Sequence, residues 1–467
     1  MNKPITNPGQ LASLAGSPEP VTICGRVYKI RRMSGFAFLL LQLSRPDSSG
    51  SGLLQCTWLP ELAGDLSELP AEQSCIALTG QVVSEPRSHS GYEVRAVSVR
   101  VLSTPIEDLP VVINNKALDM NLETLLDYRP ITLRNEKERA LFRIQEGICQ
   151  AVRAFLSAED FTEIHSPKLV SEGAEGGSNI FRLDYFGKEA YLAQSPQFYK
   201  QTMVGVYGRV YEIAPVYRAE HHDTSRHLNE YIGIDLEMGY IEQFQEIMEL
   251  ETQMLTAVFR HLNEHQAGEL ALWKAVLPVI PEDGIPCMTF AKVKETVRRL
   301  RSANPIQAEN IPNSHPAPES EPTLDPNSNS SLDLEPEEER LICQWIKQQT
   351  GSDFVFVTHY PSAKRPFYAM DDPENPEVTL SFDLLFRGLE ITTGGQRIHS
   401  YPEQTAKMRQ RGMNPEDFAS YLMIHRYGMP PHGGLGIGLE RLTACLLGLS
   451  NVRQTSLFPR DIHRISP

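Results

Sequence analysis

Five short β-rich segments in the first 105 residues constrain the fold of this chain more than any other feature. Gly, Ser and Pro residues separate them. Five short strands in about a hundred residues are typical of a small β-barrel or sandwich. The segments span residues 21–30, 37–42, 53–58, 74–84 and 92–102.

A second, larger domain is expected after a proline-punctuated stretch at residues 106–133, which we interpret as a hinge. A helix is predicted from Asn135 to Ala158, because apolar residues recur at helical spacing and Asn135 is a good N-cap. Strands and helices then alternate to the C-terminus, without the glycine motifs of a dinucleotide-binding fold or a P-loop. The predicted domains are therefore residues 1–105 and 134–467.

The distribution of charge favours selective over indiscriminate binding of nucleic acid. The formal net charge of the 467 residues is −15, which excludes a polybasic protein that binds nucleic acid through bulk charge. The near-neutral first domain nevertheless carries a basic cluster, GRVYKIRR. An oligonucleotide-binding barrel fits this pattern, with Arg31, Arg32, Phe36 and Phe38 as phosphate and stacking contacts. An ordinary small β-domain with a solvated basic edge fits it equally well.

Residues 302–339 differ from the rest of the chain in composition, since they are rich in Pro, Ser, Asn and acidic residues. Such a segment cannot bury enough apolar surface to offset the entropy lost on ordering. We therefore predict a disordered surface insertion, with an acidic partner-binding segment as the alternative. Nine acidic residues lie between Arg301 and Arg340, so part of the negative charge belongs to this segment.

Cysteine usage and hydropathy predict a cytoplasmic protein with no membrane association. The seven cysteines are dispersed and form no CxxC pair, which favours reduced thiols over disulfides or a zinc site. No apolar run approaches the ~20 residues that a membrane-spanning helix needs. The first ten residues, MNKPITNPGQ, show no secretory signal.

Three separated segments combine polar residues with strand patterns, and the first spans residues 208–240. Arg218 ends a strand, Arg226 and His227 lie in a polar loop, and Asp235 lies on the return strand. An arginine side chain presents a planar fork that matches phosphate oxygens, so this hairpin suits a polyphosphate. A surface hairpin with internal ion pairs is the alternative interpretation.

The second segment, residues 381–401, places Asp383 and Glu390 seven residues apart. This odd spacing on one continuous strand would put the two side chains on opposite faces. A bend at Arg387 and Gly388 would instead bring both carboxylates to one site for a hard cation such as Mg²⁺ held jointly with phosphates.

The third segment, residues 433–442, is a glycine-alternating strand that runs into a helix, with Arg441 in the first helical turn. Glycines at alternate positions allow a planar ring to lie flat against the backbone. A helix N-terminus beside an arginine favours an anion. A purely structural strand-to-helix turn is the alternative.

The first and third segments resemble motifs 2 and 3 of the class II aminoacyl-tRNA synthetases, and the long helix followed by FTEIHSPKLV resembles motif 1. The sequences EGGSNIF, QSPQFYKQ, RHLNEY, GGQRIHSY and LFPRDIHRISP are similar to those of aspartyl-tRNA synthetases of the archaeal and eukaryotic type. The resemblance covers the chain except residues 302–339. It implies an α+β fold, with an N-terminal anticodon-binding OB-fold β-barrel and a class II catalytic domain on an antiparallel sheet flanked by helices.

The resemblance implies an aspartate–tRNA ligase that uses ATP and Mg²⁺. Aspartate would attack the α-phosphate of ATP to give aspartyl-adenylate and pyrophosphate, and tRNA would then accept the aspartyl group. The acceptor is tRNA-Asp alone or both tRNA-Asp and tRNA-Asn, and the enzyme is expected to be a homodimer that pairs through motif 1. The alternatives are an asparaginyl-tRNA synthetase-like enzyme, which Lys200 opposes because asparaginyl relatives lack it, and a non-catalytic tRNA-binding paralogue.

The resemblance also assigns roles to individual residues. Catalytic roles fall to Arg218 and Arg441. ATP binding is implied for Arg218, Ala219, Glu220, Arg226, His227, Leu228, Glu390, Gly438, Leu439, Glu440 and Arg441. Aspartate binding is implied for Glu175, Ser195, Gln197, Phe198, Tyr199, Lys200, Arg218, Asp235, Thr393 and Arg397, with Lys200 and Arg397 gripping the side-chain carboxylate. Magnesium would be held by Asp383, Glu390 and Thr393, and the anticodon contacted by Arg26, Tyr28, Arg31, Phe38 and His89.

Overall fold

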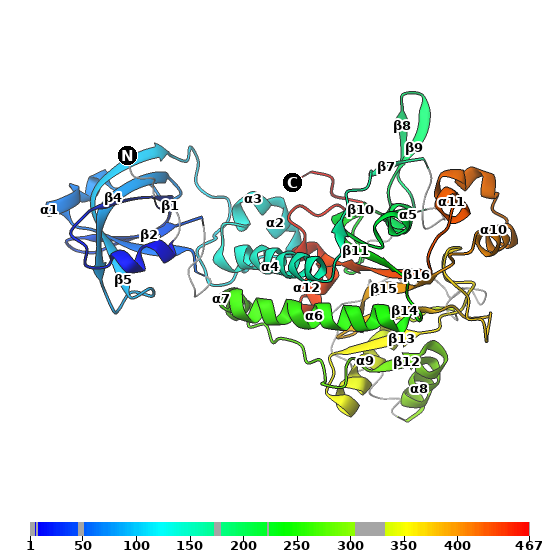
Figure 1. Cartoon of the computed structure of the whole chain (residues 1–467). Coiled ribbons are helices and arrows are strands. Elements are labelled where there is room, and N and C mark those ends of the chain that lie inside the picture. The colour runs from blue at the N-terminus through cyan, green and yellow to red at the C-terminus, as the bar shows by residue number, and fades with distance from the viewer. Residues whose placement is uncertain are drawn as a thin grey trace. The chain divides into compact units, whose positions relative to one another are not determined.

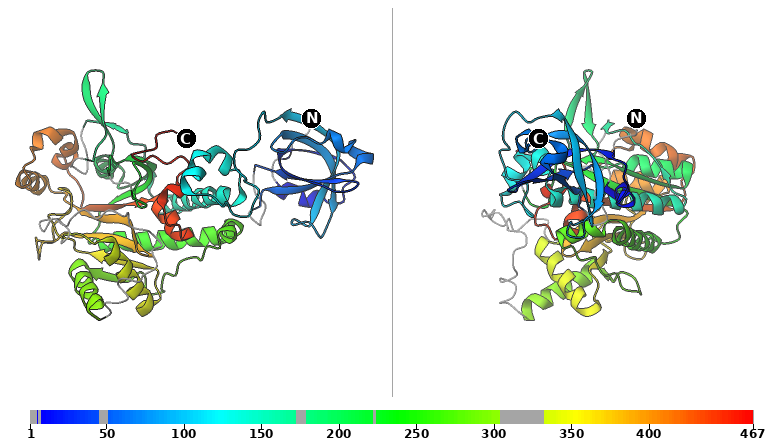
Figure 2. Two further views of the ribbon diagram at one scale, coloured as in Figure 1. Left: turned by 180° about the vertical axis from the view of Figure 1, so that it is seen from behind. Right: turned by 90° about the vertical axis from the view of Figure 1, so that its left-hand side faces the viewer.

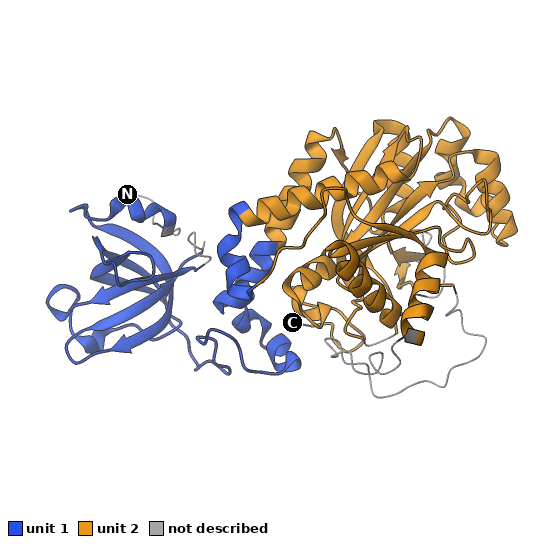
Figure 3. Cartoon of the chain, turned by 90° about the horizontal axis from the view of Figure 1, so that it is seen from below, with its two compact units in different colours: residues 1–144, 264–274 blue, residues 145–263, 275–467 orange. Residues whose placement is uncertain are grey.

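The computed structural model describes residue 5 and residues 8–44, 51–171, 179–221, 224–303 and 332–466. The chain divides into two compact units (Figure 3). Unit 1 comprises residues 1–144 and 264–274, and unit 2 comprises residues 145–263 and 275–467. The domain limits drawn from the sequence stay a prediction.

Unit 1 contains a closed β-barrel with the strand order β1-β2-β3-β5-β4, as the five β-rich segments predicted. Alternate residues of β2, namely Ala37, Leu39 and Leu41, are fully buried, so one face of this strand forms part of the barrel core. The elements are η1 (Pro8–Gln10), η2 (Ala12–Leu14), β1 (Val21–Arg32), β2 (Ala37–Gln42), β3 (Leu53–Trp58), α1 (Pro60–Ala63), η3 (Leu66–Glu68), β4 (Cys75–Ser84) and β5 (Tyr92–Ser103).

The predicted hinge, residues 106–133, lies within unit 1 and contains two short helices. The next helix begins where the sequence predicts it. Asn135 caps this helix, because its Oδ1 accepts hydrogen bonds from the backbone amides of Lys137 and Glu138 at 3.0 and 3.3 Å. The helices are α2 (Leu122–Asp127), α3 (Arg129–Thr132), α4 (Glu136–Ala158), which continues into unit 2, and α7 (Ala267–Trp273).

Unit 2 is built on an eight-stranded sheet with the order β12-β13-β14-β15-β16-β11-β10-β6. The strands are antiparallel except at the two ends, where β12 pairs in parallel with β13 and β6 with β10. The sheet contains β6 (Thr162–Glu163), β10 (Arg209–Tyr217), β11 (Glu230–Gly239), β12 (Cys287–Thr289), β13 (Phe354–Thr358), β14 (Ser381–Phe386), β15 (Leu389–Arg397) and β16 (His432–Gly438). A small sheet of β7 (Leu169–Val170), β9 (Lys188–Leu192) and β8 (Arg182–Tyr185) carries a hairpin that projects from unit 2 (Figures 1 and 2).

Helices flank this sheet, which confirms the predicted class of catalytic domain. Glu251 of α6 (Gln245–His265) accepts a hydrogen bond from Thr392 of β15 at 2.6 Å, so α6 covers the face opposite the neighbouring Thr393. The Thr393 face is therefore the one on which a site can open. The other helices of unit 2 are α5 (Gln197–Tyr207), α8 (Phe290–Ala303), α9 (Pro336–Thr350), α10 (Tyr401–Gln410), η5 (Pro415–Phe418), α11 (Ala419–Arg426), α12 (Leu439–Leu447) and η6 (Val452–Thr455).

The predicted disordered insertion at residues 302–339 is wrong at both ends. Its first two residues end α8, and its acidic end begins α9. Glu335 and Glu338 form a reciprocal capping box there, and the helix dipole stabilises carboxylates in a first turn. The acidic run is therefore a helix start that the composition did not distinguish from a solvated segment. Residues 304–331 of the prediction lie outside the described residues.

Candidate functional site

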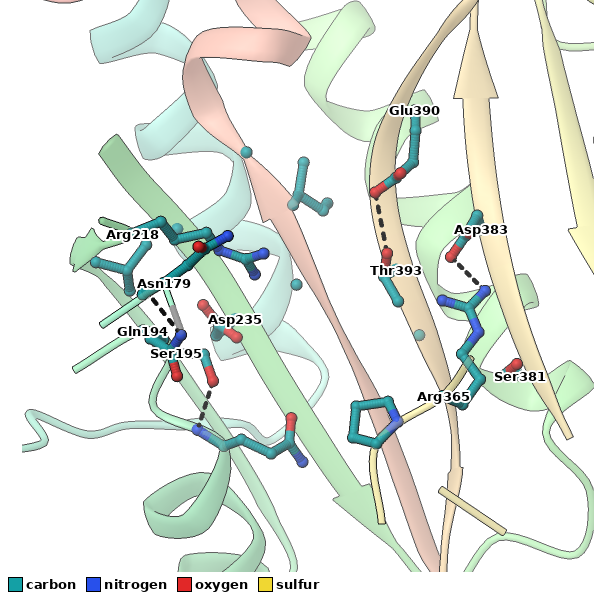
Figure 4. A pocket seen from close by; sticks show the side chains of 18 of the residues that line it. Asn179, Gln194, Ser195, Arg218, Asp235, Arg365, Ser381, Asp383, Glu390 and Thr393 are labelled. Atoms are coloured by element: carbon teal, nitrogen blue, oxygen red, sulfur yellow. Dashed lines mark hydrogen bonds and ion pairs between the residues drawn. The ribbon is translucent and has the colours of Figure 1, made fainter. Parts of the chain in front are cut away.

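A cavity of about 860 Å³ opens on the uncovered face of the unit 2 sheet. Its walls come from α5, β10, β11, β14, β15 and β16, from the start of α12 and from a segment at residues 363–369. Figure 4 shows Arg218 and Asp235 on one side of the cavity, facing Asp383 and Glu390 on the other. The three polar segments, which are separate in the sequence, thus line one cavity.

Lys200 lies deep in this cavity, on the first turn of α5, and is 2% exposed. Its Nζ donates to Asp235 Oδ1 at 2.9 Å and to the Leu435 carbonyl oxygen at 2.8 Å, and it lies 3.5 Å from Glu237 Oε2. Asp235 and Glu237 can share this cation because residues two apart on a strand point to the same face. The ammonium is therefore held at a fixed position by β11 and β16.

Arg397, at the end of β15, supplies a second buried cation beside Lys200. Its Nε donates to Glu237 Oε1 at 3.0 Å and its Nη2 to the Gly434 carbonyl oxygen at 3.0 Å. Position 434 requires glycine, because an added Cβ would lie 2.1 Å from the Leu236 carbonyl oxygen. The two cations and two carboxylates leave this end of the cavity formally neutral.

The electrostatics of these carboxylates differ although both are buried. Burial raises the pKa of Asp235, and the charge of Lys200 only partly opposes this. Burial also acts on Glu237, but the charges of Arg397 and Lys200 outweigh it and lower the pKa of that carboxyl. Burial lowers the pKa of the neighbouring His432 to about 4, so its imidazole is neutral at physiological pH. The fixed charges are thus those of the two ion pairs.

The opposite wall carries two carboxylates and a hydroxyl from one hairpin. β14 and β15 are joined by a turn at Arg387 and Gly388, with φ of 49° and 90°, as the sequence predicts. Leu385 pairs with Glu390 and Asp383 with Thr393, which leaves Ile391 as a bulge. The turn and the bulge together bring three oxygen-bearing side chains to one face, and Thr393 Oγ1 donates to Glu390 Oε1 at 3.0 Å.

This oxygen set fits Mg²⁺ held jointly with phosphates, because that ion is usually bound through one or two carboxylates plus substrate oxygens. Within the described residues, no group of three or more His, Cys, Asp and Glu side chains could hold a metal by itself. Arg365 Nη2 lies 2.8 Å from Asp383 Oδ1. Burial and the charge of Glu390 raise the pKa of Asp383 to about 6, against the opposing charge of Arg365. A further cation beside Asp383 and Glu390 would therefore stabilise the charged form of these carboxylates.

Cationic and polar side chains of the β10–β11 hairpin and of α12 lie near the β14–β15 hairpin. Arg441 Nη1 donates to the Glu390 carbonyl oxygen at 3.1 Å, and its Nε donates to the Arg226 carbonyl oxygen at 3.4 Å. Arg226 forms an ion pair with Glu339 of α9. His227 Nε2 lies 3.4 Å from Glu220 Oε2. This end of the cavity has the charge and the planar donors that suit a polyphosphate.

The backbone turn after β10 is held by Asn229, whose Nδ2 donates to the carbonyl oxygens of Arg218 and Glu220 at 2.7 and 3.1 Å. These bonds fix Arg218 at the cavity wall beside Asp235 (Figure 4). The carboxylate of Glu440 accepts from the Ile232 amide at 3.1 Å, and burial raises its pKa to about 8. Glu440 therefore also fixes β11 relative to α12.

Most of the residues assigned to aspartate, ATP or magnesium line this cavity, but four described ones, Phe198, Tyr199, Ala219 and Leu439, do not. Phe198 and Tyr199 line a smaller cavity of about 160 Å³, which Ser195 also borders. Leu439 is buried, and the amide of Ala219 donates to the Asn179 carbonyl oxygen at 3.1 Å. Glu175 lies outside the described residues. The residues that line the main cavity are Ser195, Gln197, Lys200, Arg218, Glu220, Arg226, His227, Leu228, Asp235, Asp383, Glu390, Thr393, Arg397, Gly438, Glu440 and Arg441.

Several residues that shape the site have no role predicted from the sequence, among them Arg365, Glu237 and Glu339. Glu237 carried a signal, its spacing of two residues from Asp235 on a predicted strand. Arg365 lies in KRPFY, where two adjacent basic residues precede aromatic ones, but nothing local pairs it with Asp383. Glu339 carried no signal, because it belongs to the acidic run that was assigned to the insertion.

In unit 1, Arg31 and His89 are exposed, and Arg26 and Phe38 are partly exposed. Phe38 pairs across β1 and β2 with Arg31, and its ring contacts Phe36 edge-on, with centroids 5.2 Å apart. An aromatic ring beside a guanidinium on a barrel face is suited to single-stranded nucleic acid. Tyr28 is different: it is 3% exposed and its hydroxyl donates to the Ile113 carbonyl oxygen at 2.6 Å, so it packs within unit 1 rather than offering its ring to a base.

The fold and the cavity are those of a class II synthetase, and the family model for class II tRNA synthetases (D, K and N) matches residues 121–462. The chain belongs to this family. It is 44% identical over 454 residues to the aspartate–tRNA(Asp/Asn) ligase of Deinococcus radiodurans, and the match covers 96% of each chain. The ligase of the same name from Thermus thermophilus is 44% identical over 449 residues, which cover 96% of this chain and 97% of that one.

A solved structure extends this similarity to the whole fold. The asparaginyl-tRNA synthetase of Pyrococcus horikoshii, complexed with asparaginyl-adenylate, matches with a TM-score of 0.83 and 27% identity over 100% of both chains. These comparisons confirm the predicted family and fold class. Within the described residues, no helix is long and apolar enough to cross a membrane.

Proposed function

We propose that this chain is an aspartate–tRNA ligase that joins L-aspartate to ATP and then to tRNA. The proposal rests on the pair of buried cations, Lys200 and Arg397, which lie in one cavity with the carboxylates of β14–β15. The same cavity has Arg226 and Arg441 at the end that suits a polyphosphate, which we call the nucleotide end. The names of the Deinococcus and Thermus relatives support the same substrates.

The charges of the cavity explain how aspartate would be selected. Its ammonium group would take Asp235 as partner, which frees Lys200 to bind the side-chain carboxylate together with Arg397. The charges in the cavity stay balanced after this exchange of partners. Aspartate brings one ammonium group and two carboxylates, and its α-carboxylate is directed at ATP. Asparagine would leave a buried cation unpaired, and such a loss costs on the order of 2–5 kcal/mol.

The reaction needs positioning more than acid–base chemistry. Arg218 would bridge the aspartate carboxylate and the α-phosphate of ATP, so that the attacking oxygen lies in line with the leaving pyrophosphate. Arg226 and Arg441 would hold the polyphosphate and neutralise charge as it develops. Asp383, Glu390 and Thr393 would hold Mg²⁺, which when bound supplies further neutralisation of the phosphates. The first product is aspartyl-adenylate, and the terminal ribose hydroxyl of tRNA then takes the aspartyl group and releases AMP.

We further propose that the tRNA choice is relaxed, so that tRNA-Asp and tRNA-Asn are both aspartylated by a cytoplasmic homodimer. The two relatives at 44% identity, both named for tRNA(Asp/Asn), support the relaxed choice.

The motif 1 resemblance of α4 and β6 supports the dimer, which analytical ultracentrifugation tests. All seven cysteines are free, which supports a reducing compartment.

The test is aminoacylation of purified tRNA-Asp and tRNA-Asn with labelled aspartate or asparagine in the presence of ATP. The proposal predicts aspartyl-tRNA from both tRNAs and no asparaginyl-tRNA. Aspartylation of tRNA-Asp alone would refute the relaxed choice. Asparaginylation would establish the asparaginyl alternative, and no product with either amino acid would establish the non-catalytic one.

A further inference from the structure

Four cations that line the cavity at its nucleotide end are each paired with a carboxylate. The pairs are Arg441–Glu390, Arg365–Asp383, Lys364–Asp333 and Arg226–Glu339. Glu390 and Asp383 have a second task in the proposed function, since they are the carboxylates expected to hold Mg²⁺. Glu339 has none, and it is only 7% exposed. A buried carboxylate directed at a substrate-binding arginine therefore needs its own explanation.

We propose that Glu339 is a positioning residue for ATP, which holds the guanidinium of Arg226 toward the polyphosphate. The inference rests on the proposed function, in which Arg226 binds the phosphates. Glu339 contacts only Nη2 of Arg226. A guanidinium has five N–H donors in a rigid fork, so the Nη1 and Nε donors remain for a ligand while one edge is anchored. Arg226 itself lines the cavity.

The surroundings of Glu339 make it a firm anchor. It lies in the first turn of α9, next to the capping box that fixes the helix start, and α9 packs against β13, β14 and β15. The Arg226 backbone is held independently, because its carbonyl oxygen accepts from Arg441 Nε at 3.4 Å. A long arginine side chain loses much rotamer entropy when a ligand immobilises it. Holding it beforehand transfers that loss from ATP binding to folding.

The experiment compares Glu339→Gln with the matched variant Glu338→Gln. Glu338 is the preceding residue, is 6% exposed and forms an ion pair with Lys294 at 2.6 Å, and neither of these two residues lines the cavity. Both substitutions remove one buried charge from the same helix turn. Aspartate-dependent ATP–pyrophosphate exchange gives the KM values for ATP, pyrophosphate and aspartate. Calorimetry gives the Kd of a non-hydrolysable aspartyl-sulfamoyl adenosine, which lacks the β- and γ-phosphates, and the Kd values of ATP and AMP.

Glu339→Gln is expected to raise the KM for ATP and for pyrophosphate about tenfold, and Glu339→Asp, which keeps the charge, to restore part of the loss. The Kd values of the sulfamoyl analogue and AMP, and the KM for aspartate, should stay within about twofold of wild type in both Gln variants. Unchanged or lower KM values for ATP and pyrophosphate would overturn the proposal. An equal rise in the Kd of the sulfamoyl analogue would also overturn it, because that result would mean that Glu339 has only a structural role.

The proposed function is tested separately by the wild-type protein. If wild type shows no aspartate-dependent exchange, the function is wrong whatever the variant does. The positioning role is then still decided by calorimetry: it predicts that Glu339→Gln weakens ATP about tenfold but not AMP, and equal effects on both nucleotides contradict it.

Discussion

Replacing Lys200 by Met is expected to abolish the preference for aspartate over asparagine while leaving ATP binding intact. The substitution keeps an unbranched chain in a site that is 2% exposed but removes the ammonium 2.9 Å from Asp235. A hydrogen bond to a charged group contributes about 1.5–3 kcal/mol. At about 1.4 kcal/mol per tenfold change, the KM for aspartate should rise roughly 10- to 150-fold. The KM for asparagine should fall, because the substitution removes the buried cation that asparagine would leave unpaired.

The assay is ATP–pyrophosphate exchange with aspartate and asparagine, and the matched control is Lys168→Met. Lys168 forms a comparable ion pair, with Nζ 2.9 Å from Glu212 Oε2, but does not line the cavity. The control should keep the wild-type preference for aspartate. A KM for ATP that rises in Lys200→Met as much as the KM for aspartate would refute this reasoning, as would a preference that survives the substitution.

Three further predictions follow from the geometry. Gly434→Ala should lower the free energy of unfolding by about 1–3 kcal/mol, because the added Cβ would lie 2.1 Å from a backbone oxygen; an unchanged thermal midpoint contradicts this. Burial raises the pKa of Glu251 from 4.5 to about 8, so the folded state binds this proton more tightly, and the stabilisation present below pH 4.5 is lost as the pH rises toward 8. Melting temperatures from pH 5 to 8 should therefore fall more for wild type than for Glu251→Gln, and parallel curves would exclude the shift. EDTA should stop the exchange reaction, and Asp383→Asn should raise the Mg²⁺ concentration for half-maximal rate by about tenfold or more; an unchanged Mg²⁺ requirement would show that Asp383 is no ligand.

Local patterns were enough to predict much of the fold. The barrel strands follow from short β-rich segments that Gly, Ser and Pro separate, and the start of α4 follows from the capping preference of Asn135. Composition failed at residues 335–339, because an acidic helix start and a solvated acidic segment have the same residues and differ only in what they pack against. The predicted anticodon contact of Tyr28 failed for a related reason. Its hydroxyl donates a hydrogen bond to the carbonyl oxygen of Ile113, which is distant in sequence.

Some features of the candidate site likewise follow from local sequence, and others depend on contacts between distant segments. The turn at Arg387 and Gly388 is encoded locally, because two adjacent residues with positive φ suit a tight hairpin. The bulge at Ile391 has no signal of that kind, yet it brings Thr393 beside Glu390. Partners such as Arg365 for Asp383 come from segments that only the folded sheet brings together, so single-sequence patterns cannot pair them.

The proposed function depends on activation of aspartate, and exclusion of asparagine, by the cavity of unit 2. ATP–pyrophosphate exchange by the wild-type protein tests this most directly, because it reports formation of the adenylate without any tRNA. We predict Mg²⁺-dependent exchange with aspartate and, at the same concentration, exchange at least roughly thirtyfold slower with asparagine, as a penalty of about 2 kcal/mol or more requires. Exchange that is equal for the two amino acids, faster with asparagine, or absent with both would contradict it.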